Sequence, residues 1–268
     1  MYYFLAAAGL YTIGWLLFGY FRRNNAPGSI LAFHAIDSKL DLSITRNTLN
    51  GFESIIQFLS TNGYCGTTLS GQRDDTDIAL TFDDGWACFY DNAWPLLQKY
   101  NFAATIFVVT DYIGHTSNWD YKKKMHLDWQ QLRELVDHGI EIGSHGATHC
   151  DLRGLSNDKL EYEIAGSKKL LEDKLGCAIK YFSYPFGRYD SRVMGAVREA
   201  GYHKAFALSI GFGDFAIARH GVYLYDSPYS IYLKLIKHSP WEQDKDYINN
   251  SLSGGTIAFR KLFPVKRG

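Results

Sequence analysis

Short apolar segments alternate along this chain with longer segments whose apolar residues recur at helical spacing. Residues 78–82 (Ile-Ala-Leu-Thr-Phe) are of the first kind, and residues 48–62, with Leu49, Phe52 and Ile55, are of the second. Strands of about five residues that alternate with helices of roughly 10 to 20 residues are typical of β/α units around a parallel sheet. A chain of 268 residues is long enough for one barrel domain of this kind. We therefore expect an α/β fold whose parallel sheet closes into a barrel.

Polar residues that could take part in catalysis or metal binding directly follow four of the predicted strands. They are His34, the pair Asp83-Asp84, the pair His145 and His149, and the segment 185–187. In a parallel barrel the carboxyl ends of all strands lie on one face, where barrel enzymes keep their active sites. Residues that are remote in the sequence are therefore expected to converge there.

Asp83 and Asp84 are neighbours at the end of a strand, so their side chains point in different directions. One carboxylate can then bind a metal ion while the other accepts a proton from water. The alternative is that the pair only caps the following helix, as Asp-Gly segments often do. For this pair taken alone, capping is the stronger interpretation.

His145 and His149 are four residues apart, and one helical turn between them would place both rings on one face. Two surface histidines are an equally good interpretation of this spacing alone. Together with an aspartate, however, two imidazoles form a metal-binding set with positions left for water. A bound Zn²⁺ lowers the pKa of its water from ~15.7 to near 7, so a modest base suffices for hydrolysis.

Three of these segments resemble the first three motifs of the polysaccharide deacetylases, the NodB-homology proteins of carbohydrate esterase family 4. The segments are residues 81–85 (Thr-Phe-Asp-Asp-Gly), 144–149 (Ser-His-Gly-Ala-Thr-His) and 184–187 (Tyr-Pro-Phe-Gly), and the likeness runs from about residue 30 to residue 208. The resemblance implies a distorted (β/α) barrel with fewer than eight complete units. It also implies metal-dependent removal of N- or O-acetyl groups from sugars.

By this resemblance Asp83 is the catalytic base, and Asp84, His145 and His149 hold a divalent metal, which we expect to be Zn²⁺. The substrate is expected to be an N-acetylated glycan. A deacylase of a lipid-linked sugar intermediate or of a non-sugar amide would use the same site. A protein that binds a metal or a glycan without catalysis is a third hypothesis.

The third motif implies residues that contact the substrate. Pro185, Phe186 and Gly187 are expected to wall the groove, with the backbone N–H of Phe186 helping to bind the oxyanion. His34 is expected to face the same site, either as a substrate contact or as a core histidine. Trp86, which follows Asp-Asp-Gly, is interpreted as a core residue.

Two features depart from the family pattern. Many members have an arginine before the proline of the third motif that pairs with the base, and this chain has Ser183-Tyr184 there, so Asp83 is expected to lack that partner. Arg188 and Arg219 are possible substitutes, although either is more often a structural arginine.

The second departure is the missing late Leu-x-His motif, which supplies the general acid in the family. His220 and His238 are the candidates, and His220 is the better one because it follows a plausible strand. An ordinary surface or core histidine is the stronger interpretation of His220 taken alone. Beyond residue 211 we expect only a strand at residues 222–225 and a short helix over residues 231–238.

Residues 2–20 carry no charged side chain, and Arg22 and Arg23 follow closely. A segment of this length spans a bilayer as a helix, and it lacks the basic start and the cleavage site of a signal peptide. We therefore expect a single-pass anchor in the cell membrane, and two arginines alone leave the side of the catalytic domain open. The expected organisation is an anchor over residues 1–21, a linker over 22–28, a deacetylase-like domain over 29–240 and an irregular tail over 241–268.

Charge and cysteine content exclude other classes of function. The formal net charge is zero, so nothing in the electrostatics favours a nucleic-acid partner. The four cysteines are widely spaced and do not form a zinc ribbon or a disulfide framework. Cys150 adjoins His149 and is expected to be a buried, inert thiol.

Overall fold

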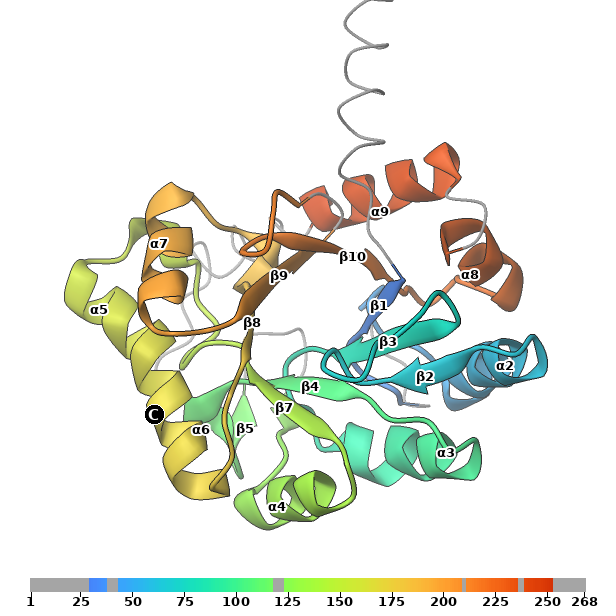
Figure 1. Cartoon of the computed structure of the whole chain (residues 1–268), viewed down its shortest axis with the longest axis horizontal. Helices are drawn as coiled ribbons and strands as arrows, with labels where there is room; N and C mark the ends of the chain where they lie inside the picture. The colour runs from blue at the N-terminus through green and yellow to red at the C-terminus, as the bar shows by residue number, and fades with distance from the viewer. Residues whose placement is uncertain (1–28, 38–42, 118–122, 209–210, 236–238, 253–268) are drawn as a thin grey trace, which may run out of the picture.

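A computed structural model describes residues 29–37, 43–117, 123–208, 211–235 and 239–252 of the chain (Figure 1). Eight parallel strands pair in the order β1-β10-β9-β8-β7-β4-β3-β2, and an additional pairing of β1 with β3 closes seven of them into a barrel. The strand β2 lies outside this ring, on β3. The strands are β1 (Ile30–Phe33), β2 (Cys65–Thr67), β3 (Asp77–Phe82), β4 (Thr105–Val108), β7 (Glu141–Ser144), β8 (Tyr181–Ser183), β9 (Lys204–Leu208) and β10 (Ile217–Gly221).

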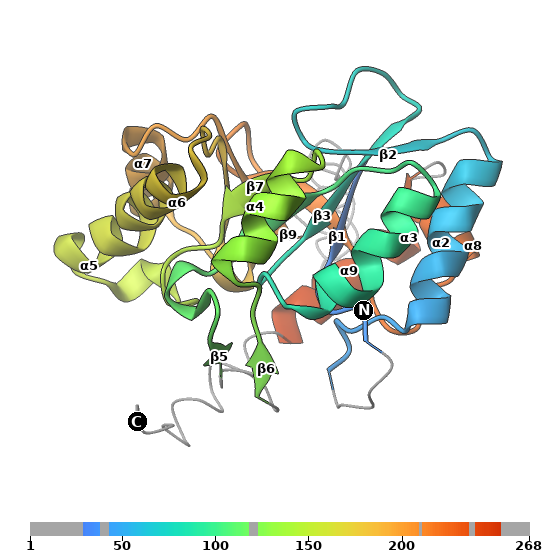
Figure 2. The same ribbon diagram turned by 90° about the horizontal axis from the view of Figure 1, so that it is seen from below.

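Helices surround the barrel and cover its outer face (Figures 1 and 2). They are α2 (Leu49–Thr61), α3 (Trp94–Lys99), α4 (Trp129–Asp137), α5 (Asn157–Glu161), α6 (Ser167–Leu175), α7 (Ser191–Glu199), α8 (Pro228–Leu235) and α9 (Pro240–Leu252). The single helix predicted between residues 156 and 175 is continuous but contains the π-helical turn η4 (Tyr162–Gly166) between α5 and α6. It ends at Gly176, which adopts the left-handed conformation (φ 67°) that glycine tolerates best.

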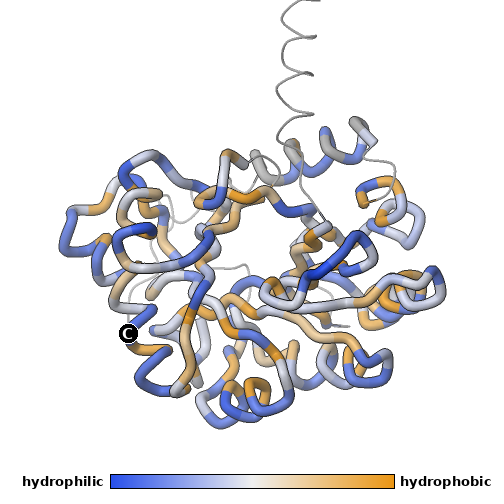
Figure 3. Tube along the Cα trace, in the orientation of Figure 1, coloured by the Kyte–Doolittle hydropathy of each residue, from blue (hydrophilic) through white to orange (hydrophobic). Residues whose placement is uncertain are grey.

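The core forms between the strands and the apolar faces of these helices. In α2, for example, Phe52, Ile55, Ile56 and Leu59 are buried, and the Thr48 side chain caps the helix. Each fully buried side chain of this kind stabilises the fold by about 1.5–3 kcal/mol relative to exposure. The hydropathy colouring accordingly shows apolar residues along the strands and polar residues on the outer turns (Figure 3). This rigid frame holds the carboxyl ends of the strands in place.

The insertion over residues 111–127 forms an antiparallel hairpin of β5 (Thr116–Ser117) and β6 (Lys124–Met125), which projects from the barrel in Figure 2. Its base pairs with the segment that follows β3. The Leu127 N–H donates to the Gly85 carbonyl, and the Ala87 N–H donates to the Met125 carbonyl, both at 2.9 Å. The hairpin is therefore attached directly to the Asp-Asp-Gly turn.

The sequence predictions fail mainly in the last third of the chain. The strand predicted at residues 222–225 is wrong, because the last barrel strand is β10, whose Arg219 and His220 are buried with ionic partners rather than exposed. The irregular tail is also wrong in part, since α9 occupies residues 240–252. Apolar periodicity cannot identify a strand that buries charged residues.

The short strand β2 was not predicted. Its central residue is Gly66, where an added Cβ would lie 2.3 Å from Phe102 Cδ2, so this strand depends on a close approach that only glycine permits. Among the described residues, no helix is long and apolar enough to cross a bilayer. The predicted anchor over residues 1–21 and the linker over 22–28 lie outside these residues and stay predictions.

Candidate active site

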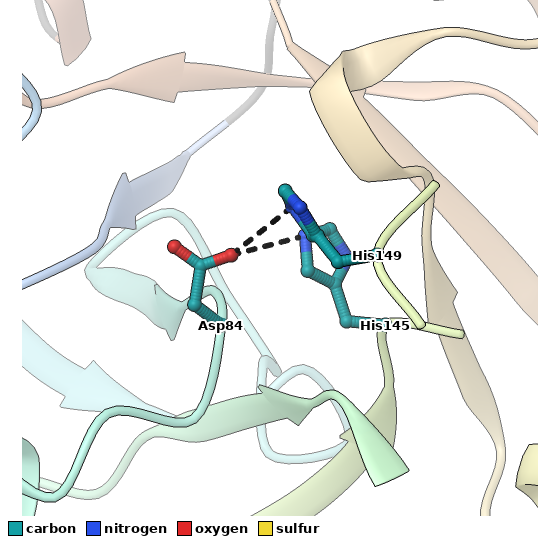
Figure 4. A group of neighbouring side chains, drawn as sticks. All are labelled: Asp84, His145 and His149. Atoms are coloured by element: carbon teal, nitrogen blue, oxygen red, sulfur yellow. Dashed lines mark ion pairs between the residues drawn. The ribbon is translucent and has the colours of Figure 1, made fainter. Parts of the chain in front are cut away.

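Asp84, His145 and His149 converge at the carboxyl ends of β3 and β7. Their side-chain donor atoms all lie within 4.8 Å of one another, and all three residues are buried. Asp84 Oδ1 is 3.6 Å from His145 Nε2 and 3.3 Å from His149 Nε2, and both rings point toward this oxygen in Figure 4. One carboxylate oxygen and two imidazole nitrogens are a donor set that suits Zn²⁺ and related divalent ions. The residues present therefore fit a metal ion.

The backbone at this cluster adopts conformations that ordinary residues avoid. Asp84 (φ 73°), His149 (φ 55°) and Phe186 (φ 60°) all lie in the left-handed region. Strained residues of this kind concentrate at functional sites, where surrounding contacts hold them. Gly85 is also left-handed (φ 69°), and a Cβ there would lie 2.9 Å from Val108 Cγ1, so the turn after Asp84 requires glycine.

The segment that carries both histidines is an irregular loop, so the helical turn expected between them is wrong. The loop bends at Gly146 (φ 81°) and His149 instead. His145 is also oriented by a hydrogen bond, because its Nδ1 lies 2.7 Å from the Ser183 carbonyl and leaves Nε2 toward Asp84. The two rings converge through loop geometry and not through helical spacing.

Glu163 fixes the conformation of this loop through hydrogen bonds, and its role was not predicted from the sequence. Its buried carboxylate accepts hydrogen bonds from the backbone N–H of Ala147 (2.8 Å), from that of Thr148 (2.9 Å) and from the Thr148 hydroxyl. Glu163 belongs to the π-helical turn η4, and π-turns often occur at functional sites. The available sequence signal was the position of this glutamate three residues after Leu160, on the apolar face of a long amphipathic helix.

Asp83 is buried and forms a bidentate ion pair with Arg219 of β10. Arg219 Nη1 donates to Asp83 Oδ1 and Nη2 donates to Oδ2, each at 2.8 Å. Burial alone would raise the pKa of Asp83, but the charges of Arg219 and His145 outweigh it and hold that pKa below its ordinary value. Asp83 is therefore an ionised carboxylate beside the Asp84 cluster.

The arginine that pairs with Asp83 is Arg219, one of the two substitutes considered for the missing arginine of the third motif. Arg219 is fully buried, and its guanidinium also donates to Thr81 Oγ1 (3.0 Å) and Ser183 Oγ (2.7 Å). Of the two substitutes considered, Arg188 lies elsewhere and contacts Asp151 at 3.4 Å. The arginine thus comes from the last barrel strand, far in sequence from the third motif.

His220 does not face this site. It follows Arg219 in β10, and successive side chains of a strand point to opposite faces. Arg219 points into the barrel, whereas the His220 ring lies toward α9, with Nδ1 3.3 Å from Asp246 Oδ2. We therefore do not assign the general-acid role to His220. The other candidate, His238, lies outside the described residues.

His34 does lie at the site. Phe33 of β1 is in register with Phe82 of β3, so His34 and Asp83 extend side by side from adjacent strands. Burial lowers the pKa of the His34 imidazole to about 4, and Asp83 opposes this effect. Its Nδ1 is buried and has no hydrogen-bond partner among the described residues.

The third motif borders the cluster as expected. Pro185–Gly187 forms a short 3-10 turn in which Pro185 is buried, while Phe186 and Gly187 are partly exposed. The Phe186 ring centroid lies 4.6 Å from that of His149. Cys150, the residue after His149, is partly rather than fully buried, and this burial raises the pKa of its thiol to about 12, which is consistent with an inert thiol.

Trp86 is buried, as expected of a core residue, but it also makes a polar contact with the cluster. Its indole Nε1 donates to Asp84 Oδ2 at 2.9 Å. The sequence signal was its position directly after Asp-Asp-Gly.

Comparisons with known proteins identify the family to which this chain is similar. A family model described as polysaccharide deacetylase matches residues 70–205. The putative polysaccharide deacetylase YxkH of Bacillus subtilis is 34% identical over 182 residues, which cover 65% of this chain and 61% of that protein. A poly-beta-1,6-N-acetyl-D-glucosamine N-deacetylase of Staphylococcus aureus is 28% identical over 177 residues, which cover 59% of each protein.

Solved structures are similar as well. The putative polysaccharide deacetylase BA0330 from Bacillus anthracis superposes with a TM-score of 0.66 at 26% identity, over 77% of this chain and 68% of that one. The chain spans about three fifths of the length of the curated relatives named above.

Proposed function

This chain belongs to the polysaccharide deacetylase family, and from that premise we propose that it is a metal-dependent hydrolase that removes acetyl groups from N-acetylated sugars. The observation that carries the proposal is the pair of adjacent carboxylates with different surroundings. Asp84 faces two imidazoles, whereas Asp83 is held by Arg219. A protein that only bound a metal would not need the second, separately oriented carboxylate.

Asp84, His145 and His149 would hold the metal, which we expect to be Zn²⁺. When bound there, a divalent ion would polarise the acetyl carbonyl and lower the pKa of a water molecule. The remaining steps depend on residues of this chain.

Asp83 is proposed as the base that accepts a proton from the attacking water. Its lowered pKa keeps the carboxylate ionised at neutral pH, and the two hydrogen bonds from Arg219 fix its orientation. A positioned general base typically contributes about 10²–10⁴ in rate. The Arg219 partner also resolves the first of the two departures from the family pattern, since the base is paired with an arginine after all.

The backbone N–H of Phe186 is proposed to bind the oxyanion that forms when water attacks the carbonyl. Its turn lies beside His149, and Phe186 is held in a left-handed conformation by the surrounding structure. A backbone donor aimed at developing charge is typically worth several kcal/mol, about 10²–10³ in rate.

His34 is proposed to pass the proton from Asp83 to the departing amine, in place of His220. The two residues extend from adjacent strands in register, and the lowered pKa of His34 leaves its ring neutral at rest. A neutral imidazole beside the base suits a relay, since it can accept a proton at one nitrogen and release one from the other.

The substrate is proposed to be an N-acetylated polysaccharide or oligosaccharide. The Staphylococcus aureus relatives are named for poly-beta-1,6-N-acetyl-D-glucosamine, which makes N-acetylglucosamine oligomers the first substrates to test. A lipid-linked sugar or a non-sugar amide would use the same residues and would differ only in the contacts outside the acetyl group.

The test is acetate release from N-acetylglucosamine oligomers by the full-length chain, with and without a chelator. We expect release that stops on chelation and returns when Zn²⁺ is added back. Absence of release from the metal-loaded protein with glycan, lipid-linked and simple amide substrates alike would contradict the proposed hydrolysis.

A further inference from the structure

Asp84 presents two oxygens with different surroundings. Oδ1 faces the Nε2 atoms of His145 (3.6 Å) and His149 (3.3 Å), as Figure 4 shows. Oδ2 accepts a hydrogen bond of 2.9 Å from the indole Nε1 of the buried Trp86. An indole N–H that occupies Oδ2 leaves Oδ1 as the oxygen directed at a metal.

The position of Trp86 is set by the hairpin β5–β6. Trp86 forms an antiparallel bridge with His126, and the two rings pack with centroids 4.3 Å apart. His126 is in turn held through Nε2, which lies 2.9 Å from the Ser117 hydroxyl of β5. Lys124 of β6 places its Nζ 5.1 Å from the centre of the Trp86 ring. Residues from both strands of the hairpin therefore fix the plane of the indole.

We propose that Trp86 is a positioning residue that makes Asp84 a one-oxygen ligand, and that the hairpin β5–β6 serves to hold it in place. A carboxylate can bind a metal through one oxygen or through both, and the choice changes the number of positions left for water and substrate. Asp84 also has a left-handed backbone (φ 73°), a strained conformation that persists only where surrounding contacts such as the Trp86 hydrogen bond hold the residue. The inference rests on the proposed metal-binding function of Asp84, His145 and His149.

Co²⁺ binding to the full-length chain tests this role without an activity assay, because the visible absorption of Co²⁺ reports its coordination number. Trp86→Phe keeps an aromatic ring against His126 and removes the N–H. Groups that orient metal ligands typically affect affinity by about 10- to 100-fold, and we expect a loss of that size together with a changed Co²⁺ spectrum. The control is Trp94→Phe, which alters another buried tryptophan that packs on Tyr90 in the helical layer.

The outcomes separate the inference from the proposed function. If the wild-type protein does not bind Co²⁺, the proposed metal site itself is contradicted. A wild-type protein that binds, with Trp86→Phe unchanged within about twofold and with the same spectrum, would overturn only the role of Trp86. If Trp86→Phe does not fold, replacement of Trp86 by 3-benzothienylalanine preserves the bicyclic shape and substitutes sulfur for the N–H, with the same two outcomes.

Discussion

The Arg219 guanidinium donates two parallel hydrogen bonds of 2.8 Å to the Asp83 carboxylate, joining residues 136 positions apart. The pair is fully enclosed, and Thr81 and Ser183 supply further oxygen acceptors for the guanidinium. It spans the barrel interior between β10 and the end of β3. One contact therefore links the closure of the barrel to the orientation of the proposed base.

Arg219→Met should destabilise the fold. Removing one partner of a buried ion pair leaves the other charge without compensation, which typically costs about 3–5 kcal/mol. Chemical denaturation of the two proteins at neutral pH measures the difference. The double variant Asp83→Asn with Arg219→Met is the control, since it removes both charges and should recover much of the loss. Equal stability of the single variant and the wild type would show that the pair is not energetically coupled.

Asp83 and Asp84 should differ in what their removal abolishes. Asp84→Ala should lose metal binding and turnover together, because it removes the oxygen donor of the metal set. Asp83→Asn should retain the metal and lose about 10²–10⁴ in turnover, the usual contribution of a general base. Metal content by elemental analysis and kcat for acetate release check both statements. Normal turnover in metal-loaded Asp83→Asn would refute the assigned base.

The metal-free protein should lose stability as the pH falls from about 6.5 toward about 4. Burial lowers the pKa of His34 to about 4 and that of His126 to about 3, so the unfolded chain binds these protons at a higher pH than the folded chain. More protons bound in the unfolded state means that stability rises with pH. Thermal melting in the presence of a chelator across this pH range measures how steeply the melting temperature depends on pH. His126→Phe should make that dependence smaller. A melting temperature that is flat or rises on acidification would contradict the buried neutral state.

The lowered pKa of Asp83 affects stability over a lower range of pH. A carboxyl group with a depressed folded-state pKa contributes stability above its unfolded pKa of about 3.9 and loses it as the pH falls further. The Asp83 contribution should therefore disappear only below a pH of about 3.9, which lies below the range of His34 and overlaps only the lowest part of the range of His126. Comparison of wild type with Asp83→Asn over the acid range separates the two contributions.

Glu163→Gln should weaken metal binding without touching a proposed ligand. The carboxylate accepts three hydrogen bonds from the loop between His145 and His149, and an amide can accept at only one of its two positions. We expect a loss of about 10- to 100-fold in metal affinity, the usual range for groups that orient ligands. Glu161→Gln, which alters an exposed residue of the same helix, is the matched control. Equal affinities of the two variants would show that the loop holds its shape without the Glu163 carboxylate.

The alternation of apolar segments and amphipathic helices predicted the barrel, because that pattern depends only on which local faces must be buried. For the same reason the ends of β3 and β7 were predicted to meet, and the structure brings Asp84, His145 and His149 together there. Helix capping is local in the same way, since the side chains of Thr48 and Asp128 each accept a hydrogen bond from the backbone N–H three residues further on.

The partners of buried polar groups were decided only by the tertiary structure. Arg219 and His220 are adjacent in the sequence, yet one enters the barrel toward Asp83 and the other turns outward to Asp246. Likewise, Trp86 contacts Asp84 because a hairpin some thirty to forty residues further along the chain holds its ring. Hydrophobic periodicity reports which side chains avoid water, but a buried charge or N–H is stabilised by one particular partner at hydrogen-bond distance, and that partner depends on how distant strands are placed in space.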